Sequence, residues 1–191
     1  IYDLGFNVFG IDPDPSMIKI ASSRCSDCTF FTEDFMGDFS KFFDCDVLIA
    51  LGNVFGLIAA NFSFEKLIKK TTEYFKSEGT LIFQILNTEK DRTGWSNPRT
   101  IHNEKGDIIF LRGFKTSQKF IHPQIITLYK PKNDPQWYIQ SATDTSIPRI
   151  NSTEMFDLLK KNYYKKIEIF GDYQKHPYES NTSIDMIVVA E

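Results

Sequence analysis

Carboxylate and amide side chains follow several short apolar runs in this 191-residue sequence, where they could bind a polar ligand. The first is Asp12, which closes an apolar run made by Val8, Phe9 and Ile11 and stands just before Pro13. The run predicts a buried parallel strand, and Pro13 keeps the preceding residue extended. In a doubly wound nucleotide-binding fold, an acid that ends the second strand accepts hydrogen bonds from ribose hydroxyls. Asp12 fits that role; the alternative is that it only ends the strand and caps a turn.

Two later apolar segments also end on polar residues. A strand predicted over residues 29–32 is followed by Asp34, and one predicted over 47–51 is followed by Asn53. If both strands run parallel to the first, all three polar residues emerge at one edge of the sheet, where a single cleft can form. The Asn53 amide could orient an acceptor there, or it could only close the turn after its strand.

Three more polar residues are candidates for contact with a substrate. Gln84 and Asn87 could reach the cleft from their apolar strand, although internal hydrogen bonding at a strand end is the favoured interpretation. Arg112 alternates with apolar neighbours, and its planar fork would suit a substrate carboxylate if it pointed inward. Exposure to solvent is the favoured alternative for Arg112. Arg149 is a weaker candidate for the same contact.

The cysteines and histidines do not have the spacing of a metal site. Cys25 and Cys28 form a Cys-x-x-Cys pair, but no histidine lies nearby in the sequence. Ordinary loop and core thiols are therefore favoured over a zinc site or a disulfide. The histidines lie in separate segments and indicate surface or hydrogen-bonded residues rather than bases: His102, His122 and His176. Some aromatic residues could line an acceptor pocket, although core positions are favoured: Trp95, Trp137 and Tyr138.

Helix caps and apolar periodicity predict the elements that must position these groups. Asp14 as cap and Pro15 at the first position predict a helix directly after Asp12. Gly5 predicts the stop of an earlier helix. A fold of this type has a strand and a glycine-rich turn before that earlier helix, and the sequence contains neither. We therefore expect the sequence to be the remainder of a longer protein.

The order of the following elements predicts an α/β fold. An amphipathic helix is expected over residues 63–76 and a strand over 80–87. Residues 88–150 lose helical spacing and predict an antiparallel β insertion that covers a substrate cleft. A helix capped by Asn151 follows, and then come two strands without a helix between them. These strands predict a C-terminal antiparallel hairpin. We expect one domain over residues 1–191.

The composition is that of a globular protein, with 41% hydrophobic residues, 25% charged residues and a net charge of -3. Residues 1–60 carry nine acids and three bases, and the remainder carries sixteen acids and nineteen bases. Neither part forms a basic patch, which argues against a nucleic-acid partner. No apolar run approaches the roughly 18 residues of a membrane span, and no signal peptide is recognised. We expect a cytoplasmic protein without membrane contact, in an oligomeric state that the sequence leaves open.

The terminal hairpin and the strand end Gly10-Ile11-Asp12 resemble class I S-adenosylmethionine-dependent methyltransferases, whose Rossmann-like sheet finishes with an inserted antiparallel strand. More narrowly, Leu51-Gly-Asn53-Val-Phe55-Gly-Leu57 resembles the Leu-Gly-Asn-Ser-Phe-Ala-His-Leu segment of glycine N-methyltransferase-like small-molecule enzymes. Phe83-Gln-Ile-Leu-Asn87 is similar to the strand that follows in their relatives. The resemblance covers nearly the whole chain. The sequence lacks the family's first glycine-rich motif. Val54, Gly56 and Leu57 also differ from the residues of the glycine N-methyltransferase motif.

The resemblance implies S-adenosylmethionine as cofactor and assigns roles by matching position. It implies that Asp12 holds the ribose, that Asp34 approaches the adenine amino group, and that Met17 packs near the adenine. The loop after the next strand would face the methionine part and the substrate. The implied cofactor-binding residues are Asp12, Pro13, Met17, Asp34, Phe35, Leu51, Gly52 and Asn53. The candidate substrate-binding residues are Asn53, Gln84, Asn87 and Arg112.

Methyl transfer from a sulfonium is an in-line displacement, so orientation and desolvation supply much of the acceleration. A neutral amine acceptor needs no strong base, and no catalytic residue is assigned. We therefore predict methyl transfer to a small-molecule acceptor. Two alternatives stay open: a nicotinamide-dependent oxidoreductase, since Asp12 would serve either nucleotide, and a non-catalytic binding domain of the same fold.

Overall fold

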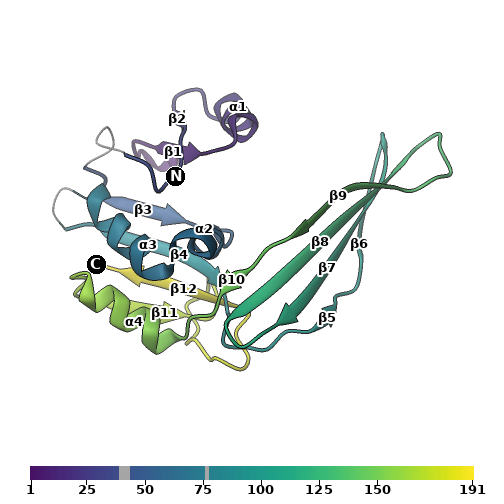
Figure 1. The fold of residues 1–191 in the computed structure, drawn as a ribbon. Coiled ribbons are helices and arrows are strands. Elements are labelled where there is room, and N and C mark those ends of the chain that lie inside the picture. Colours follow the sequence, from purple (N-terminus) through teal and green to yellow (C-terminus); the bar gives the residue numbers. More distant parts are fainter. Residues whose placement is uncertain (39–43, 76–77) are drawn as a thin grey trace. The chain divides into compact units, whose positions relative to one another are not determined.

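The computed structural model describes residues 1–38, 44–75 and 78–191, and Figure 1 shows the elements along the chain. They belong to two compact units, Ile1–Phe43 and Asp44–Glu191. Among the described residues, no helix has the length and apolar character to cross a membrane.

The first unit is a parallel strand pair with one helix. Its elements are η1 (Tyr2–Leu4, a 3-10 helix), β1 (Phe9–Asp12), α1 (Pro15–Arg24) and β2 (Thr29–Thr32). The two strands pair in parallel with Asp12 opposite Thr32, and α1 packs against both of them. The Asp14 side chain caps α1 by accepting a hydrogen bond from the backbone N–H of Ser16 at 2.8 Å. The predicted helix after Asp12 is therefore present, with Pro15 in its first turn.

Strand β1 is parallel as predicted, but it is not buried. Phe9 is 54% exposed, and none of the described residues of this unit is in the buried class. The reason is that a two-stranded sheet with a single helix can cover only part of its apolar surface from within the unit. Gly5 ends the 3-10 helix in the left-handed region, with φ 85°, as expected of a glycine stop.

The second unit contains a core sheet of four strands in the order β11-β12-β4-β3. These strands are β3 (Val47–Ala50), β4 (Thr80–Leu86), β11 (Ile167–Phe170) and β12 (Asp185–Ala190). Strands β3 and β4 are parallel, whereas β12 runs antiparallel to both β4 and β11. The predicted α/β fold class and its C-terminal antiparallel hairpin are thus confirmed.

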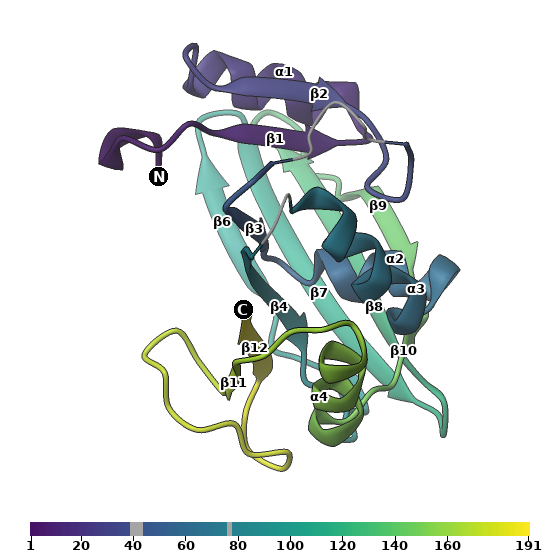
Figure 2. The ribbon, with the colours of Figure 1, turned by 90° about the vertical axis from the view of Figure 1, so that its left-hand side faces the viewer.

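Helices cover one face of this core sheet, and the apolar core lies between them. Helices α2 (Val54–Phe62), α3 (Phe64–Thr71) and α4 (Ser152–Lys161) lie on the same side of the sheet (Figure 2). On β4, alternate residues are buried, and one of them, Phe83, has its ring 5.0 Å from that of Phe55 on α2. Fully buried residues from strands and helices complete the core: Leu67, Ile68, Leu81, Ile85, Met155, Leu159, Met186 and Val188.

Residues 88–150 form a second, antiparallel sheet that extends from the end of the core sheet in Figure 1. Its strands are β5 (Gly94–Trp95), β6 (Arg99–Asn103), β7 (Gly106–Thr116), β8 (Phe120–Pro131), β9 (Tyr138–Asp144) and β10 (Ile147–Pro148). Long strands β7 and β8 form the centre, with β6 on β7 and β9 on β8. The predicted antiparallel insertion is confirmed. That it covers a substrate cleft remains a prediction.

Two helical segments differ from expectation. The helix expected over 63–76 is α3, which ends at Thr71 and continues as the 3-10 helix η3 (Thr72–Tyr74); Lys76 lies outside the described residues. Helix α2 was not predicted at all. Its sequence, Val-Phe-Gly-Leu-Ile-Ala-Ala-Asn-Phe, is apolar almost throughout. Such a run lacks the polar and apolar alternation by which an amphipathic helix is recognised.

Candidate functional site

In the first unit, the two predicted ligand-binding acids lie at the same edge of the strand pair. Asp12 is the last residue of β1, and Asp34 stands two residues after the end of β2. The Glu33 backbone N–H donates to the Asp12 carbonyl at 3.2 Å, so the strands stay paired up to this edge. This arrangement is what parallel pairing requires, and it places both acidic residues at the carboxyl ends of β1 and β2.

Each of these carboxylates is oriented by the turn that follows it. Asp12 Oδ1 accepts a hydrogen bond from the Asp14 backbone N–H at 2.8 Å, and Asp34 Oδ1 accepts one from the Met36 N–H at 2.8 Å. One oxygen is therefore fixed by an Asx turn, while the second oxygen of each acid has no partner within residues 1–38. The turn-capping role and a ligand-binding role are compatible. Three further predicted cofactor contacts lie on the surface or partly buried: Pro13, Met17 and Phe35.

In the second unit, the loop between β3 and α2 is locked by side-chain hydrogen bonds. Gly52 and Asn53 both have positive φ, 78° and 63°, and their backbone N–H groups donate to Gln84 Oε1 at 2.8 and 2.9 Å. Asn53 Oδ1 in turn accepts from the backbone N–H of Leu86 at 2.9 Å. The two amides thus tie the end of β3 to β4. A Cβ at Gly56, in the first turn of α2, would lie 2.5 Å from Asn53 Oδ1, so any larger residue there would displace the Asn53 amide.

These bonds use the carbonyl oxygens of Gln84 and Asn53 and leave their amide N–H groups as donors. In the described parts of the chain, neither amide nitrogen has a hydrogen-bond partner. Leu51, the first residue of the same predicted contact segment, is 43% exposed. The loop is therefore a rigid donor group at the carboxyl end of the parallel strands.

Asn87 has a different surrounding, because its amide is fully used inside the protein. Its Nδ2 donates to the carbonyls of Ser180 and Ser183 at 2.8 and 2.9 Å. Its Oδ1 accepts from the Glu89 N–H at 2.9 Å and from the Tyr178 hydroxyl at 2.7 Å. Asn87 is completely buried. This is the internal hydrogen bonding that the sequence favours over a substrate contact for Asn87.

Tyr178 and Glu89 join this network and were missed by the sequence analysis. The Tyr178 hydroxyl lies 2.7 Å from Asn87 Oδ1 and 3.0 Å from Glu89 Oε1, which also accepts from the Ser152 N–H at 2.9 Å. Burial, and next the hydrogen bond to Glu89, raise the pKa of Tyr178, so its hydroxyl stays protonated as a donor. Tyr178 belongs to a polar segment between β11 and β12, and no local pattern marks one polar residue of such a segment over another.

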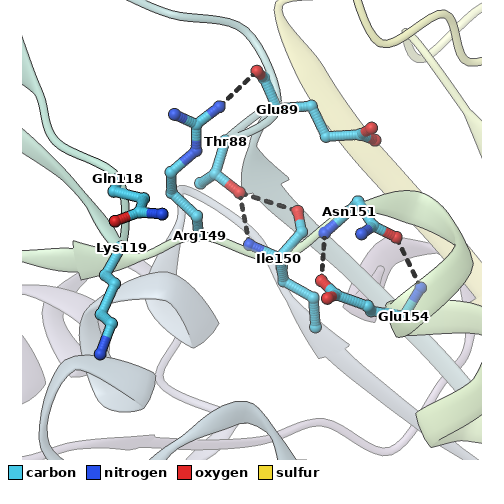
Figure 3. Close-up of a pocket in the computed structure, with 8 residues that line it drawn as sticks. All are labelled: Thr88, Glu89, Gln118, Lys119, Arg149, Ile150, Asn151 and Glu154. Atoms are coloured by element: carbon cyan, nitrogen blue, oxygen red, sulfur yellow. Dashed lines mark hydrogen bonds between the residues drawn. The ribbon is translucent and has the colours of Figure 1, made fainter.

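A polar cavity of about 460 Å³ lies where the insertion joins the core sheet (Figure 3). Its lining residues come from the end of β4, from the β7–β8 turn and from the start of α4: Thr88, Glu89, Gln118, Lys119, Arg149, Ile150, Asn151 and Glu154. The Thr88 hydroxyl donates to the Ile150 carbonyl at 2.8 Å and accepts from the Ile150 N–H at 2.9 Å. Thr88 thus connects the first residue of the insertion to its last residue, Ile150, by two hydrogen bonds.

Arg149 makes a second connection at the same junction. Its guanidinium donates to the Glu89 carbonyl at 2.6 Å and to Asp91 Oδ1 at 2.8 Å. These contacts give Arg149 a structural part instead of the substrate-binding part considered from the sequence. Arg112, the stronger candidate, is exposed on β7, opposite Ile125 of β8.

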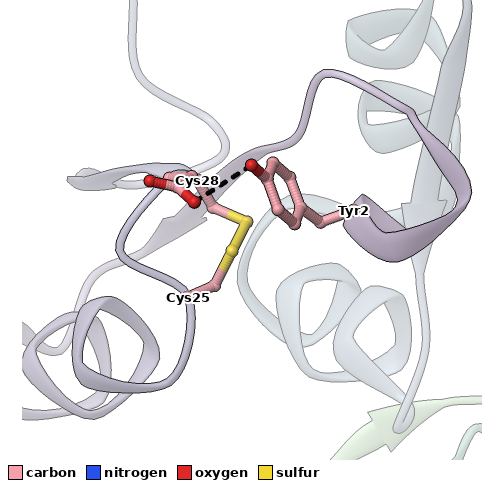
Figure 4. The surroundings of a disulfide bond; sticks show 4 residues. Tyr2, Cys25 and Cys28 are labelled. Carbon is pink, nitrogen blue, oxygen red and sulfur yellow. Dashed lines mark hydrogen bonds between the residues drawn. A yellow bond between two sulfur atoms is a disulfide. The ribbon is translucent and has the colours of Figure 1, made fainter.

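The expectation of ordinary thiols at the Cys-x-x-Cys pair was wrong. Cys25 and Cys28 form a disulfide with their Cα atoms 5.4 Å apart, between the end of α1 and the start of β2 (Figure 4). Helix α1 ends just before the pair, and its turn into the parallel strand brings the two side chains together. Beside them, the Tyr2 hydroxyl donates to Asp27 Oδ2 at 3.0 Å. The third cysteine, Cys45, is free.

The histidines have acidic or hydroxyl partners on the surface. Asp107 and Asp172 each lie 2.7 Å from a histidine Nδ1, of His102 and His176 respectively. His122 Nδ1 lies 3.0 Å from the Ser146 hydroxyl. Within the described ranges, no three His, Cys, Asp or Glu side chains gather as metal ligands would.

The chain is similar to several solved structures, although no protein-family description and no curated protein sequence matches it. An S-adenosylmethionine-dependent methyltransferase from Clostridium acetobutylicum superposes with a TM-score of 0.72 at 11% identity, covering 97% of this chain and 75% of that one. The CcbJ methyltransferase from Streptomyces caelestis gives 0.75 at 14% identity, over 99% and 80%. An amino pentose methyltransferase from Micromonospora echinaspora, solved with S-adenosylmethionine bound, gives 0.75 at 9% identity, over 99% and 76%.

At these identities the likeness concerns the fold. The chain has the Rossmann-like fold of class I S-adenosylmethionine-dependent methyltransferases, and the resemblance predicted from its strand ends and terminal hairpin is confirmed.

Proposed function

We propose that this chain transfers a methyl group from S-adenosylmethionine to a small-molecule acceptor. The observation that carries the proposal is its methyltransferase fold, shared with proteins solved with S-adenosylmethionine or S-adenosylhomocysteine bound. Two of these similar proteins are named for sugar acceptors, one as an amino pentose methyltransferase and one as a sugar N-methyltransferase. A small, polar acceptor is the class that these names favour.

The residues at the strand ends have the chemistry that this cofactor requires. The carboxylate of Asp12 keeps one oxygen without a partner among residues 1–38, and this oxygen can accept a charge-assisted hydrogen bond from a ribose hydroxyl. Asp34 can accept from the adenine amino group, and the 50% exposed side chain of Met17 offers an apolar surface for the adenine ring. Pro13 and Phe35 adjoin these acids in the sequence. All five assignments follow from position in the fold.

The locked loop at Gly52 and Asn53 is assigned to the methionine part and the acceptor. Gly52 has no Cβ and positive φ, so a ligand can approach its backbone closely. Gln84 holds the loop from behind, and its hydrogen bonds are formed before any ligand arrives. Such preorganisation means that little reorganisation is needed during the reaction. The Asn53 Nδ2 donor can orient an acceptor heteroatom.

The bound cofactor would supply a sulfonium methyl group, and the protein supplies orientation and exclusion of water. An acceptor amine would give its lone pair to the methyl carbon while the bond between that carbon and sulfur breaks and its electrons stay on sulfur. The amine proton then leaves to solvent. Because the donor is already activated, alignment of the two reactants is the main requirement. A neutral amine therefore needs no strong base from the chain.

Incubation with S-adenosylmethionine labelled in its methyl group, together with a fractionated metabolite extract, tests this function. We expect S-adenosylhomocysteine and one or more labelled small products in mass spectra. The matched control is the same protein with Asp12→Ala, which should give less of both. An absence of labelled product at saturating donor across all fractions, from protein that binds S-adenosylhomocysteine, would favour the non-catalytic binding domain.

A further inference from the structure

Arg92 is held rigidly just after β4 but lacks one expected hydrogen bond. Its backbone N–H donates to the Thr116 hydroxyl at 2.8 Å, and its carbonyl accepts from the same hydroxyl at 2.7 Å. Its terminal nitrogen donates to the Ile184 carbonyl at 2.7 Å. The Nε atom is buried and has no partner in the described structure. A buried donor without an acceptor is costly, so each such case calls for an explanation.

A second guanidinium lies on the same face of the insertion sheet. Arg112 and Phe114 are two residues apart on β7 and therefore project to one face. The guanidinium carbon of Arg92 lies 5.5 Å from the centre of the Phe114 ring, which puts Arg92 over that face as well. Arg112 is exposed, and its side chain has no hydrogen-bond or ion-pair partner among the residues described. Arg92 thus lies over the Phe114 ring, and Arg112 projects from the same face of β7 two residues away.

The charges around this pair leave it positive. Burial lowers the pKa of Arg92, Asp185 at the start of β12 opposes this shift, and Arg112 adds to it. The Tyr178 hydroxyl also faces Arg92, and it is neutral while protonated. Among the described residues, Asp185 is the carboxylate whose charge acts on Arg92, and the charge of Arg112 acts against it. An incoming anion at the exposed Arg112 guanidinium would offset the positive charge of both groups.

We propose that Arg92 and Arg112 form a subsite for an oxyanion group, a carboxylate or a phosphate, carried by the acceptor molecule. The planar fork of arginine matches the two oxygens of either group and can bind them in pairs. The ring of Phe114 would support the apolar part of the ligand. The subsite rests on the proposed function. Arg92 belongs to the segment after β4, and Asn87 at the start of this segment is held by a hydrogen bond from Tyr178. The subsite makes the acceptor an anionic or zwitterionic small molecule.

The arginine Nε–H signals in nitrogen-15 NMR spectra test the subsite without an acceptor or cofactor. Sodium acetate and sodium phosphate are titrated separately, with sodium chloride keeping the ionic strength constant. We expect the Arg92 Nε–H signal to move in a saturable way with acetate, with phosphate, or with both. The stronger of the two identifies the group on the acceptor. A signal that moves no more than with chloride alone overturns the proposal.

Two variants sharpen this titration. Arg112→Gln removes the exposed guanidinium and should weaken the affinity for the responding anion by at least about tenfold, since charged hydrogen bonds are lost. Arg99→Gln is the matched control, because Arg99 is exposed on β6 opposite Phe110, on the same sheet face as Arg112. It should leave the affinity unchanged. Equal affinities in wild type and Arg112→Gln would overturn the subsite.

Thermal melting with S-adenosylhomocysteine separates this subsite from the proposed function. We expect Arg112→Gln to keep the full stabilisation by that ligand, because the arginine contacts the acceptor and not the cofactor. If wild type binds anions but is not stabilised by S-adenosylhomocysteine, the methyltransferase proposal fails and the anion subsite stands. If the reverse is found, the subsite fails and the function stands.

Discussion

Gln84 is a polar residue in an apolar strand, and its carbonyl oxygen accepts two backbone hydrogen bonds from the loop at Gly52 and Asn53. Replacing it with leucine keeps much of the volume but leaves both N–H groups without an acceptor. Both hydrogen bonds are part-buried, and the loss of one such bond costs about 1 kcal/mol. We therefore expect Gln84→Leu to lower the free energy of unfolding by about 2 kcal/mol or more, measured with urea. Gln174→Leu, at an exposed position, is the control and should change little.

Asp12 is the residue on which the proposed cofactor site depends most. Asp12→Ala removes charge-assisted hydrogen bonds worth about 1.5–3 kcal/mol, so affinity for S-adenosylhomocysteine should fall by about one to two orders of magnitude. Isothermal titration calorimetry measures this. Asp3→Ala, an exposed acid in the 3-10 helix of the same unit, should bind like wild type. Unchanged affinity in a folded Asp12 variant would take this residue out of the site.

Tyr164 makes the stability of the folded protein depend on pH in the alkaline range. Its hydroxyl lies 2.8 Å from Thr71 Oγ1, and Thr71 itself donates to the Ile68 carbonyl, so Tyr164 must be the donor between them. Burial raises the pKa of Tyr164 to about 12. The unfolded chain ionises near pH 10, before the folded one. The stability held by the protonated phenol is thus complete below pH 10 and is lost as the pH rises from 10 to 12.

We expect this loss to reach about 2 kcal/mol near pH 11.5, at 1.36 kcal/mol for each unit of pKa difference. Tyr164→Phe should be less stable at neutral pH but should lose less between pH 9 and 11.5. Urea unfolding at both pH values measures the difference. Tyr163→Phe is the control, because Tyr163 is 89% exposed, and it should follow wild type. Equal pH dependence of wild type and Tyr164→Phe would contradict the assignment.

At the scale of elements, the sequence predicts those parts whose causes are local. Asp14 and Pro15 specify the start of α1, and Asn151 with Glu154 specifies the capping box of α4, with hydrogen bonds in both directions. The strands of the insertion follow from alternation and turns. By contrast, the disulfide depends on the turn between α1 and β2, and the Tyr178 network depends on contacts between segments far apart in the sequence. Those contacts are set by tertiary packing, and one sequence does not contain them.

The hydrogen bonds of Thr88 connect the insertion to the core sheet, and their contribution to stability can be measured. Thr88→Val keeps the shape but leaves the N–H and carbonyl of Ile150 without their partner, and Ile150 is 5% exposed. We expect the free energy of unfolding to fall by about 3 kcal/mol. Amide exchange should quicken in β10 and in the first turn of α4. The control Thr100→Val, at an exposed position of β6, should leave amide exchange in β10 and in the first turn of α4 unchanged.

At the scale of the whole molecule, the fold restricts the cofactor more than it restricts the acceptor. Nine to fourteen per cent identity to methyltransferases of known structure is enough to show a shared fold over nearly all of the chain. The residues that we propose for contact with the acceptor lie on the loop before α2, on the insertion and on the segment after β4. Their types are not fixed by the fold. This is why the cofactor class could be predicted from the sequence, whereas the proximity of Arg92 and Arg112 could not.

Asp12 at the end of β1 could bind the ribose of S-adenosylmethionine or of NAD. Thermal melting with each ligand distinguishes these two possibilities. A ligand present at 100 times its Kd stabilises the folded state by about 2.7 kcal/mol. For a protein of this size, each kcal/mol raises the Tm by about 2–4 °C. We therefore expect S-adenosylhomocysteine to raise the Tm by about 5–10 °C, and NAD at the same concentration to leave it unchanged. A rise with NAD alone would reverse the choice in favour of an oxidoreductase, because Asp12 would then hold the ribose of a dinucleotide.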